Sequence, residues 1–237
     1  MEYKVSDMMV ITIARALKGA KNAFHGVASP VPMTSILLAK KLYGDNLTYL
    51  NITGGVNVVP DELSISTDSY NLFKGTKSVF GLTEIFDLAA RGGLDIAFLS
   101  GVQIDKNARL NNSVIGDYFK PKVRLPGGAG SAVLVPNCKR GFIWRTKHDK
   151  KSFVDKVDFV TTQGNVKYVF TPLCVFEKLE NELILKSISP LSSLEEIKEN
   201  TGFEIKYNNL EYIDIPTEEE LKALYEVDPD NIRDSEF

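Results

Sequence analysis

The chain has 237 residues, 43% of them hydrophobic, which is enough to fill the core of one large α/β domain. Its net charge of -3 gives no long-range attraction to nucleic acid or to an anionic membrane, and no apolar run is long enough to span a bilayer. Two distant cysteines and two isolated histidines predict neither a disulfide framework nor a metal site. We therefore expect a cytoplasmic protein with no metal, no nucleic-acid partner and no membrane anchor.

The first elements of the chain read as helix, strand and helix. Residues 6–19 place apolar side chains on one helix face, a short strand is expected over residues 22–27, and a second helix over residues 33–42. The loop between them, residues 26–32, contains Ser29 and other small residues that let backbone N–H groups approach an anion. Because no complete phosphate-loop motif is present, a compact turn is the favoured interpretation.

Residues 47–55 predict a buried strand that stops abruptly, because β-branched and aromatic residues run straight into a pair of glycines. In open α/β sheets, ligands bind beyond the carboxyl ends of the strands. Asn51, Ile52 and Thr53 are therefore expected to face a site. None of the three is an ionisable nucleophile.

The chain continues to alternate between helix and strand. After an irregular polar segment over residues 58–75, a helix is expected over residues 83–90 and a buried strand over residues 94–99. This alternation predicts an α/β fold: an open, mostly parallel sheet with helices on both faces.

Two later loops carry polar or small residues that suit a site. Residues 103–111, which begin at Gln103, read as a polar turn that is at least as compatible with self-satisfied hydrogen bonds as with a ligand contact. Gly127, Gly128 and Ala129 place unencumbered backbone N–H groups in one bend before a helix, as in an oxyanion hole. Close helix packing is the alternative, and the two uses are compatible.

The remainder of the chain mixes strands with short acidic helices. The basic run over residues 147–151 fits a solvated connector, with proximity to a substrate carboxylate or coenzyme phosphate as the second possibility. A polar C-terminal extension begins near residue 190 of what we treat as a single domain, residues 1–237. The expected elements are strands over residues 141–146, 153–160 and 167–170, a hairpin over 175–185 that turns at Glu180, and helices over 194–200 and 217–225.

An ordered set of short motifs resembles a known family. The set consists of residues 26–30, Thr53-Gly54, residues 101–105 with Asn111, residues 115–118, residues 121–124 and residues 127–129. Each motif is weak alone, but their order and spacing over about residues 6–162 resemble the class I CoA-transferase superfamily, in particular beta subunits of the glutaconate CoA-transferase type.

The resemblance implies an open α/β sheet, a separate alpha subunit of similar fold, and an active site at the interface of this heteromer. It implies a coenzyme A thioester as substrate, with no permanently bound cofactor. The oxyanion loop of the family corresponds to Gly127, Gly128 and Ala129, as the local pattern also suggests. Substrate contacts are expected from six residues: Ser29, Asn51, Ile52, Thr53, Gly54 and Gln103.

The chain departs from the family at the nucleophile. In transferases of this family a glutamate in a Glu-x-Gly motif forms a thioester with CoA, but alignment on Gly54 places Ile52 there, and a hydrocarbon cannot do so. Shifting the alignment brings Asn51 or Thr53. The nearest carboxylates, Glu62 and Glu84, fall in a polar excursion and near a helix start.

The missing glutamate leaves several functions open. The leading hypothesis is the beta subunit of a CoA-transferase-like enzyme without a nucleophile of its own. The family also has a decarboxylase branch, with a cysteine at the nucleophile position, and ring-opening hydrolases, in which the alpha subunit contributes the carboxylate. Outside catalysis, the chain could be a binding or scaffold subunit, or a sensor that binds a phosphosugar.

Overall fold

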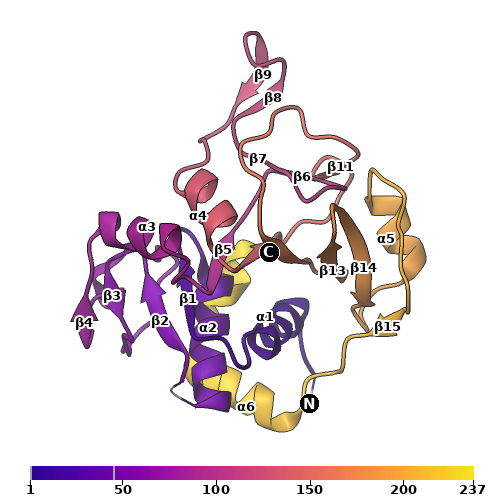
Figure 1. Ribbon diagram of the computed structural model, residues 1–237. Helices are drawn as coiled ribbons and strands as arrows, with labels where there is room; N and C mark the ends of the chain where they lie inside the picture. Colours follow the sequence, from indigo (N-terminus) through magenta and orange to yellow (C-terminus); the bar gives the residue numbers. More distant parts are fainter. Residues whose placement is uncertain (1, 45) are drawn as a thin grey trace. The chain divides into compact units, whose positions relative to one another are not determined.

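The computed structural model describes residues 2–44 and 46–237, and its internal contacts divide them into two compact units (Figure 1). Unit 1 consists of the residues up to Phe98 together with Asp214–Phe237, and unit 2 is Leu99–Ile213. The sequence predicts one domain, residues 1–237, with an extension from about residue 190. The structure instead makes residues 214–237 an integral part of unit 1.

Unit 1 combines a small sheet with a layer of helices. Strand β1 pairs in parallel with β2 and β5, whereas β3 pairs antiparallel with both β2 and β4. Helices α1, α2 and α6 pack on one another, and α2 also contacts β1. The elements are α1 Val5–Ala16, β1 Asn22–His25, α2 Pro30–Tyr43, β2 Thr48–Asn51, β3 Gly55–Val56, η1 Tyr70–Leu72, β4 Ser78–Val79, α3 Leu82–Ala90, β5 Ile96–Leu99, α6 Glu218–Val227 and η2 Ile232–Glu236.

A buried ion-pair network fastens the C-terminal segment to α1 within unit 1. The Arg233 guanidinium donates to Asp7 and to Asp228, each at 2.7 Å, and all three side chains are fully buried. At the surface, Lys4 pairs with Asp234 at 2.7 Å. Burial of a charge is tolerated only when it is paired and hydrogen-bonded, so this network makes the tail part of the core.

Unit 2 contains three sheets. Strands β10 and β12 are parallel, β12, β13 and β14 form an antiparallel meander, and β15 adds in parallel to β14. Strands β6, β7 and β11 form a second sheet, and β8 and β9 a separate hairpin. The elements are β6 Gln103–Asp105, β7 Leu110–Asn111, β8 Val114–Gly116, β9 Pro121–Arg124, α4 Ser131–Asn137, β10 Arg140–Trp144, β11 Phe153–Val154, β12 Val166–Phe170, β13 Cys174–Leu179, β14 Glu182–Ile188, α5 Leu194–Asn200 and β15 Glu211–Tyr212.

The core of unit 2 encloses a neutral histidine. His148 stacks on Phe153 with ring centroids 4.1 Å apart, and its ring nitrogens lie 3.0 Å from Thr171 Oγ1 and 2.9 Å from Thr201 Oγ1. Burial lowers the pKa of His148 from 6.5 to about 4, against the opposing effect of the nearby Asp149 carboxylate. The ring is therefore uncharged at neutral pH.

The predicted α/β architecture is confirmed, with central parallel pairs and antiparallel additions. The hairpin turning at Glu180 and the two C-terminal helices are also confirmed. Thr217 and Glu220 form a reciprocal capping box at the start of α6.

The structure differs from the predictions in several segments between residues 47 and 160. The strand expected over residues 47–55 ends at Asn51, where the chain turns into the antiparallel β3. The polar turn over residues 103–111 is the hairpin β6–β7, and the hairpin β8–β9 had no prediction. Of the strand expected over residues 153–160, only Phe153–Val154 forms.

No helix among residues 2–44 and 46–237 is long and apolar enough to cross a bilayer. The described residues likewise contain no group of three or more histidine, cysteine, aspartate or glutamate side chains placed to hold a metal ion.

Candidate active site

Asn51, the last residue of β2, is fully buried, and both atoms of its amide are used within unit 1. Its Nδ2 donates to the carbonyl of Leu72 at 2.8 Å, and its Oδ1 accepts from Gly55 N at 3.1 Å and from Thr53 Oγ1 at 2.5 Å. The side chain thus closes the turn that follows the strand. Asn51 therefore supports this turn through hydrogen bonds to Leu72, Thr53 and Gly55.

The turn itself consists of Ile52, Thr53 and Gly54, and its two side chains are half-buried. Gly54 has a φ of +89° and lies against the backbone of Phe80, whose N–H donates to the Gly54 carbonyl at 2.9 Å. A Cβ on Gly54 would overlap the Phe80 carbonyl oxygen. The glycine is required by this backbone approach, and Ile52 and Thr53 are the side chains that the turn presents.

His25 lies beside Asn51, because β1 and β2 pair in parallel and these residues are register partners at their carboxyl ends. Its Nδ1 donates to the Gly26 carbonyl at 2.8 Å, so its Nε2 accepts from the Tyr49 hydroxyl at 2.6 Å. The ring is fully buried, and burial lowers its pKa from 6.5 to about 4 although the bond to Gly26 raises it. Sequence analysis regarded His25 as isolated, since the strand register that brings it here is non-local.

The loop before α2 is satisfied from within unit 1. Ser29 is buried, its hydroxyl donates to the Val27 carbonyl at 2.9 Å, and its N–H donates to Thr67 Oγ1 at 3.2 Å. At the start of α2, Val31 N donates to the Glu236 carboxylate at 2.7 Å. A carboxylate of the same chain therefore occupies the helix N-terminus at which an anion was considered, which favours the compact-turn interpretation.

The glycine-rich loop of unit 2 presents backbone donors that have no acceptor. Gly127 N donates to the Asn112 carbonyl at 2.7 Å, whereas the N–H groups of Gly128, Ala129 and Gly130 make no hydrogen bond to any described residue. Ala129 has a φ of +43° and Gly130 a φ of -76° with a ψ of -6°. Alternating left- and right-handed residues turn successive N–H groups toward one point and form an anion-binding nest.

The predicted loop, Gly127 to Ala129, overlaps the unbonded N–H groups of residues 128–130, and the N–H of Gly127 is bonded to Asn112. A non-glycine residue in the left-handed region costs about 1 kcal/mol, and such strain is concentrated at functional loops. Ala129 is the residue that carries it here.

Gly128 packs closely against Thr161 and Ser131. A Cβ on Gly128 would lie 2.6 Å from Thr161 Cγ2 and 3.0 Å from Ser131 Oγ, so only glycine fits. The Ser131 hydroxyl is buried and has no hydrogen-bond partner among the described residues. Buried hydroxyls are normally bonded, so Ser131 is an exception at the start of α4.

Gln103, predicted to bind substrate, belongs to a network that supports the neighbouring loops. Its Oε1 accepts from Asn111 Nδ2 at 2.7 Å and from Asp158 N at 3.1 Å, and only 6% of the residue is exposed. The Asp158 carboxylate in turn accepts from Gly116 N at 2.8 Å. Gln103 is thereby linked to β7, whose following residue Asn112 anchors Gly127.

The predicted residues thus fall into two groups, one in each unit: Ser29 with residues 51–54 in unit 1, and Gln103 with residues 127–129 in unit 2. The two glutamates nearest in sequence to the missing nucleophile have other positions. Glu84 caps α3 by accepting from Gly81 N, and Glu62 is exposed.

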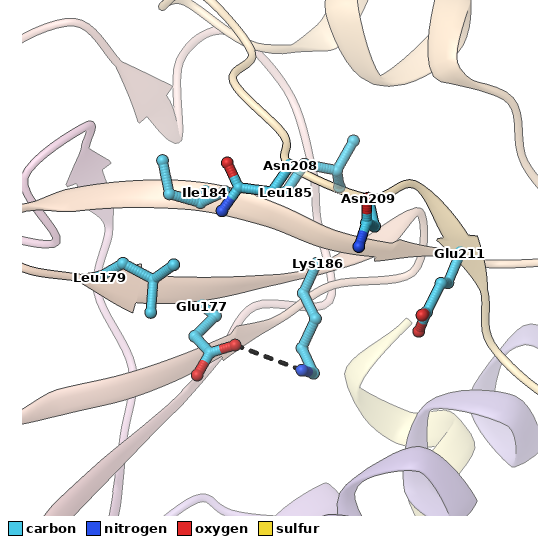
Figure 2. Close-up of a pocket in the computed structure, with 8 residues that line it drawn as sticks. All are labelled: Glu177, Leu179, Ile184, Leu185, Lys186, Asn208, Asn209 and Glu211. Carbon is cyan, nitrogen blue, oxygen red and sulfur yellow. Dashed lines mark hydrogen bonds and ion pairs between the residues drawn. The ribbon is translucent and has the colours of Figure 1, made fainter.

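A polar cavity of about 210 Å³ opens on β13, β14 and β15 of unit 2 and contains none of the predicted residues (Figure 2). The pKa of the Glu177 carboxyl is lowered overall. Burial alone would raise it, but the hydrogen bonds from Lys167 at 2.5 Å and Lys186 at 3.2 Å outweigh burial. Asn208 and Asn209 line the opposite side. The Glu177 carboxylate is thus paired on both sides, and the second carboxylate of the cavity, Glu211, is exposed, so the cavity has no buried, unpaired acid or base.

Comparison with known proteins identifies the family. The chain matches the family described as coenzyme A transferase over residues 7–200. The chain belongs to the coenzyme A transferase family. The free N–H groups of residues 128–130 and the turn after β2 all lie within the matched range.

Relatives within the coenzyme A transferase family match nearly the whole chain. The chain is 31% identical to one subunit of the 3-oxoadipate CoA-transferase of Pseudomonas knackmussii, over 94% of this chain and 92% of that protein. It is 25% identical to one subunit of the glutaconate CoA-transferase of Acidaminococcus fermentans, over 96% and 93% respectively. The crystal structure of the decarboxylase AibA/AibB superimposes with a TM-score of 0.94 and 26% identity, covering 99% of both chains.

Proposed function

We propose that this chain is the beta subunit of a heteromeric enzyme that acts on an acyl-CoA thioester in the cytoplasm. The observation that carries the proposal is the set of unused N–H groups at Gly128, Ala129 and Gly130 in a loop of a coenzyme A transferase family member. The similarity to a single subunit in each of two CoA-transferases supports a separate alpha-type partner. Two cysteines that are both free thiols fit a reducing compartment.

In the proposed reaction the loop stabilises negative charge on the thioester oxygen. Each donor aimed at a developing oxyanion lowers the activation barrier by on the order of 3 kcal/mol, because the donor is fixed in place before the charge forms. The chain's own part is therefore electrostatic.

The attacking group is proposed to come from the alpha subunit. The turn after β2 offers a hydrocarbon, a hydroxyl and a glycine, and neither Glu62 nor Glu84 is part of it. The buried Asn51 side chain stabilises this turn by hydrogen bonds to Leu72 and Gly55. Coenzyme A is a substrate in this proposal, and no permanently bound cofactor is required.

Decarboxylation is the second candidate. The chain superimposes on the decarboxylase AibA/AibB over 99% of both chains. A turn without an ionisable side chain is compatible with loss of carbon dioxide, because that step needs stabilisation of the enolate oxygen but no covalent carrier on this chain. The same three N–H groups would serve that oxygen.

The test is to co-express the chain with an alpha-type subunit and to measure CoA transfer, CoA release and carbon dioxide release on a panel of acyl-CoAs. We expect one of the three activities. Borohydride reduces a thioester between CoA and a carboxylate side chain to the alcohol and releases CoA, and we expect mass spectrometry to find no such reduced side chain on this chain. Glu62→Gln and Glu84→Gln should retain that activity. A carboxylate side chain of this chain reduced to the alcohol would show that the chain has its own nucleophile, and absence of all three activities and of CoA binding would favour a scaffold subunit.

A further inference from the structure

The hairpin β8–β9 of unit 2 leads directly into the glycine-rich loop. We call residues 113–126, which include this hairpin, the basic arm. Its base is closed by Leu125 N donating to the Ser113 carbonyl at 2.9 Å, directly before Gly127 N donates to the Asn112 carbonyl at 2.7 Å. Figure 1 shows the arm reaching beyond β6, β7 and β11 of the same unit.

The basic arm is held in one conformation. At its tip, the Asp117 carboxylate accepts from Phe119 N at 2.8 Å and from Lys120 N at 2.9 Å. The Tyr118 ring stacks on Phe159 with centroids 4.9 Å apart. Gly116 N is bonded to Asp158, which Gln103 holds in turn. A protrusion fixed in this way loses little conformational entropy on binding.

The arm carries an excess of positive charge on a chain whose net charge is negative. Lys120, Lys122 and Arg124 are exposed, and none of them forms an ion pair with a described residue. Lys122 and Arg124 lie two residues apart on β9 and therefore point to the same face. Asp117, the one acidic residue of the arm, is engaged by the turn.

We propose that the basic arm binds the 3′-phosphorylated ADP end of coenzyme A through Lys122 and Arg124, with Lys120 at the tip. This inference rests on the proposed function. The phosphates of that end are multiply negative, and an amine and a guanidinium on one strand face complement them. Phe119, 92% exposed at the tip, offers an aromatic face to the adenine.

The length of the arm fits this assignment. The pantetheine chain has about 13 bonds between the sulfur and the first phosphorus, which corresponds to four or five extended residues at three bonds each, or about 15 Å. Lys122 and Arg124 lie on β9, which ends at Arg124, and they precede Gly127 by five and three residues. A thioester held at residues 128–130 can therefore place its diphosphate beside these two side chains.

The experiment compares acyl-CoA with the corresponding acyl-pantetheine, which lacks the phosphorylated ADP end. The protein is the complex with its alpha subunit, and the variants are Lys122→Gln, Arg124→Gln and the double variant. We expect the KM for acyl-CoA to rise roughly 10-fold in the double variant at low salt, and the preference for acyl-CoA over acyl-pantetheine to fall by the same factor. The wild-type KM for acyl-CoA should rise with salt, and that dependence should weaken in the variants.

Lys198→Gln, which removes an equally exposed charge from α5, is the matched control and should leave the preference as in the wild type. A double variant that retains the full preference for acyl-CoA overturns the inference while the proposed function stands. A double variant that no longer co-purifies with the alpha subunit also overturns it, because the arm would then be a protein interface. If the wild-type complex turns over neither substrate, the proposed function itself has failed.

Discussion

The two buried histidines make the stability of this protein depend on pH between 5.5 and 7.5. His25 lies in unit 1 and His148 in unit 2, and burial lowers the pKa of each from 6.5 to about 4. An unfolded chain binds protons at these rings near pH 6, whereas the folded chain does not. Stability is therefore complete above pH 6.5 and is lost as the pH falls from 6.5 toward 4.

The magnitude follows from the two pKa values. Each histidine contributes about 3 kcal/mol when the whole range is crossed, at about 1.4 kcal/mol per pKa unit. Between pH 7.5 and 5.5 the loss is about 1 kcal/mol for each histidine and about 2–3 kcal/mol for the pair. Carboxylates contribute little in this window, because their ordinary pKa values lie near 4.

The assay is urea unfolding at a series of pH values, followed by the fluorescence of Trp144, the single tryptophan of the chain and a residue of unit 2. We expect the unfolding free energy of that transition to fall by at least about 1 kcal/mol from pH 7.5 to 5.5. The variant His148→Gln should lose the part of this pH dependence of the unfolding free energy that comes from His148. A wild-type curve that is flat in this window, or a variant with the wild-type slope, would refute the reasoning.

Three substitutions test other parts of the structure. Arg233→Met leaves two aspartates buried without a cation and should lower the unfolding free energy by about 3–5 kcal/mol in urea titrations, whereas Lys4→Met, which breaks an exposed pair, should leave the unfolding free energy close to the wild-type value. Gly128→Ala drives a methyl group into Thr161 and should lower kcat of the complex by about 10²-fold or more, with assembly retained on size-exclusion chromatography. Asn51→Ala leaves buried backbone groups unpaired and should lower the unfolding free energy by about 1–3 kcal/mol, and a wild-type value would contradict the buried network described here.

The sequence predicted those features that depend on local spacing. The capping box of Thr217 and Glu220 and the turn at Glu180 are encoded within a few residues, and both form as expected. The glycine-rich loop was predicted to expose backbone N–H groups because it combines glycine and alanine after a proline, and the N–H groups of residues 128–130 are unbonded among the described residues. The bond made by the N–H of Gly127 depends on Asn112, which no local pattern connects to the loop.

Features that depend on distant partners were not predicted. Ser29 and Asn51 are polar residues at the ends of predicted elements and therefore looked available, but bonds to Thr67 and Leu72 bury them. Glu236 reaches the start of α2 across more than 200 residues of chain. A single sequence contains no signal for such pairings, since each requires the complete fold to bring the partners together.

The residues of unit 1 are separated by the whole of unit 2, and this order constrains how the protein is made. On the ribosome, unit 2 is complete as soon as Ile213 has emerged, whereas unit 1 still lacks α6 and η2. Until Arg233 has been synthesised, Asp7 lacks the cation with which it is paired in the core. Unit 2 is thus free to fold during synthesis, whereas unit 1 can complete its fold only after Asp214–Phe237 has been synthesised.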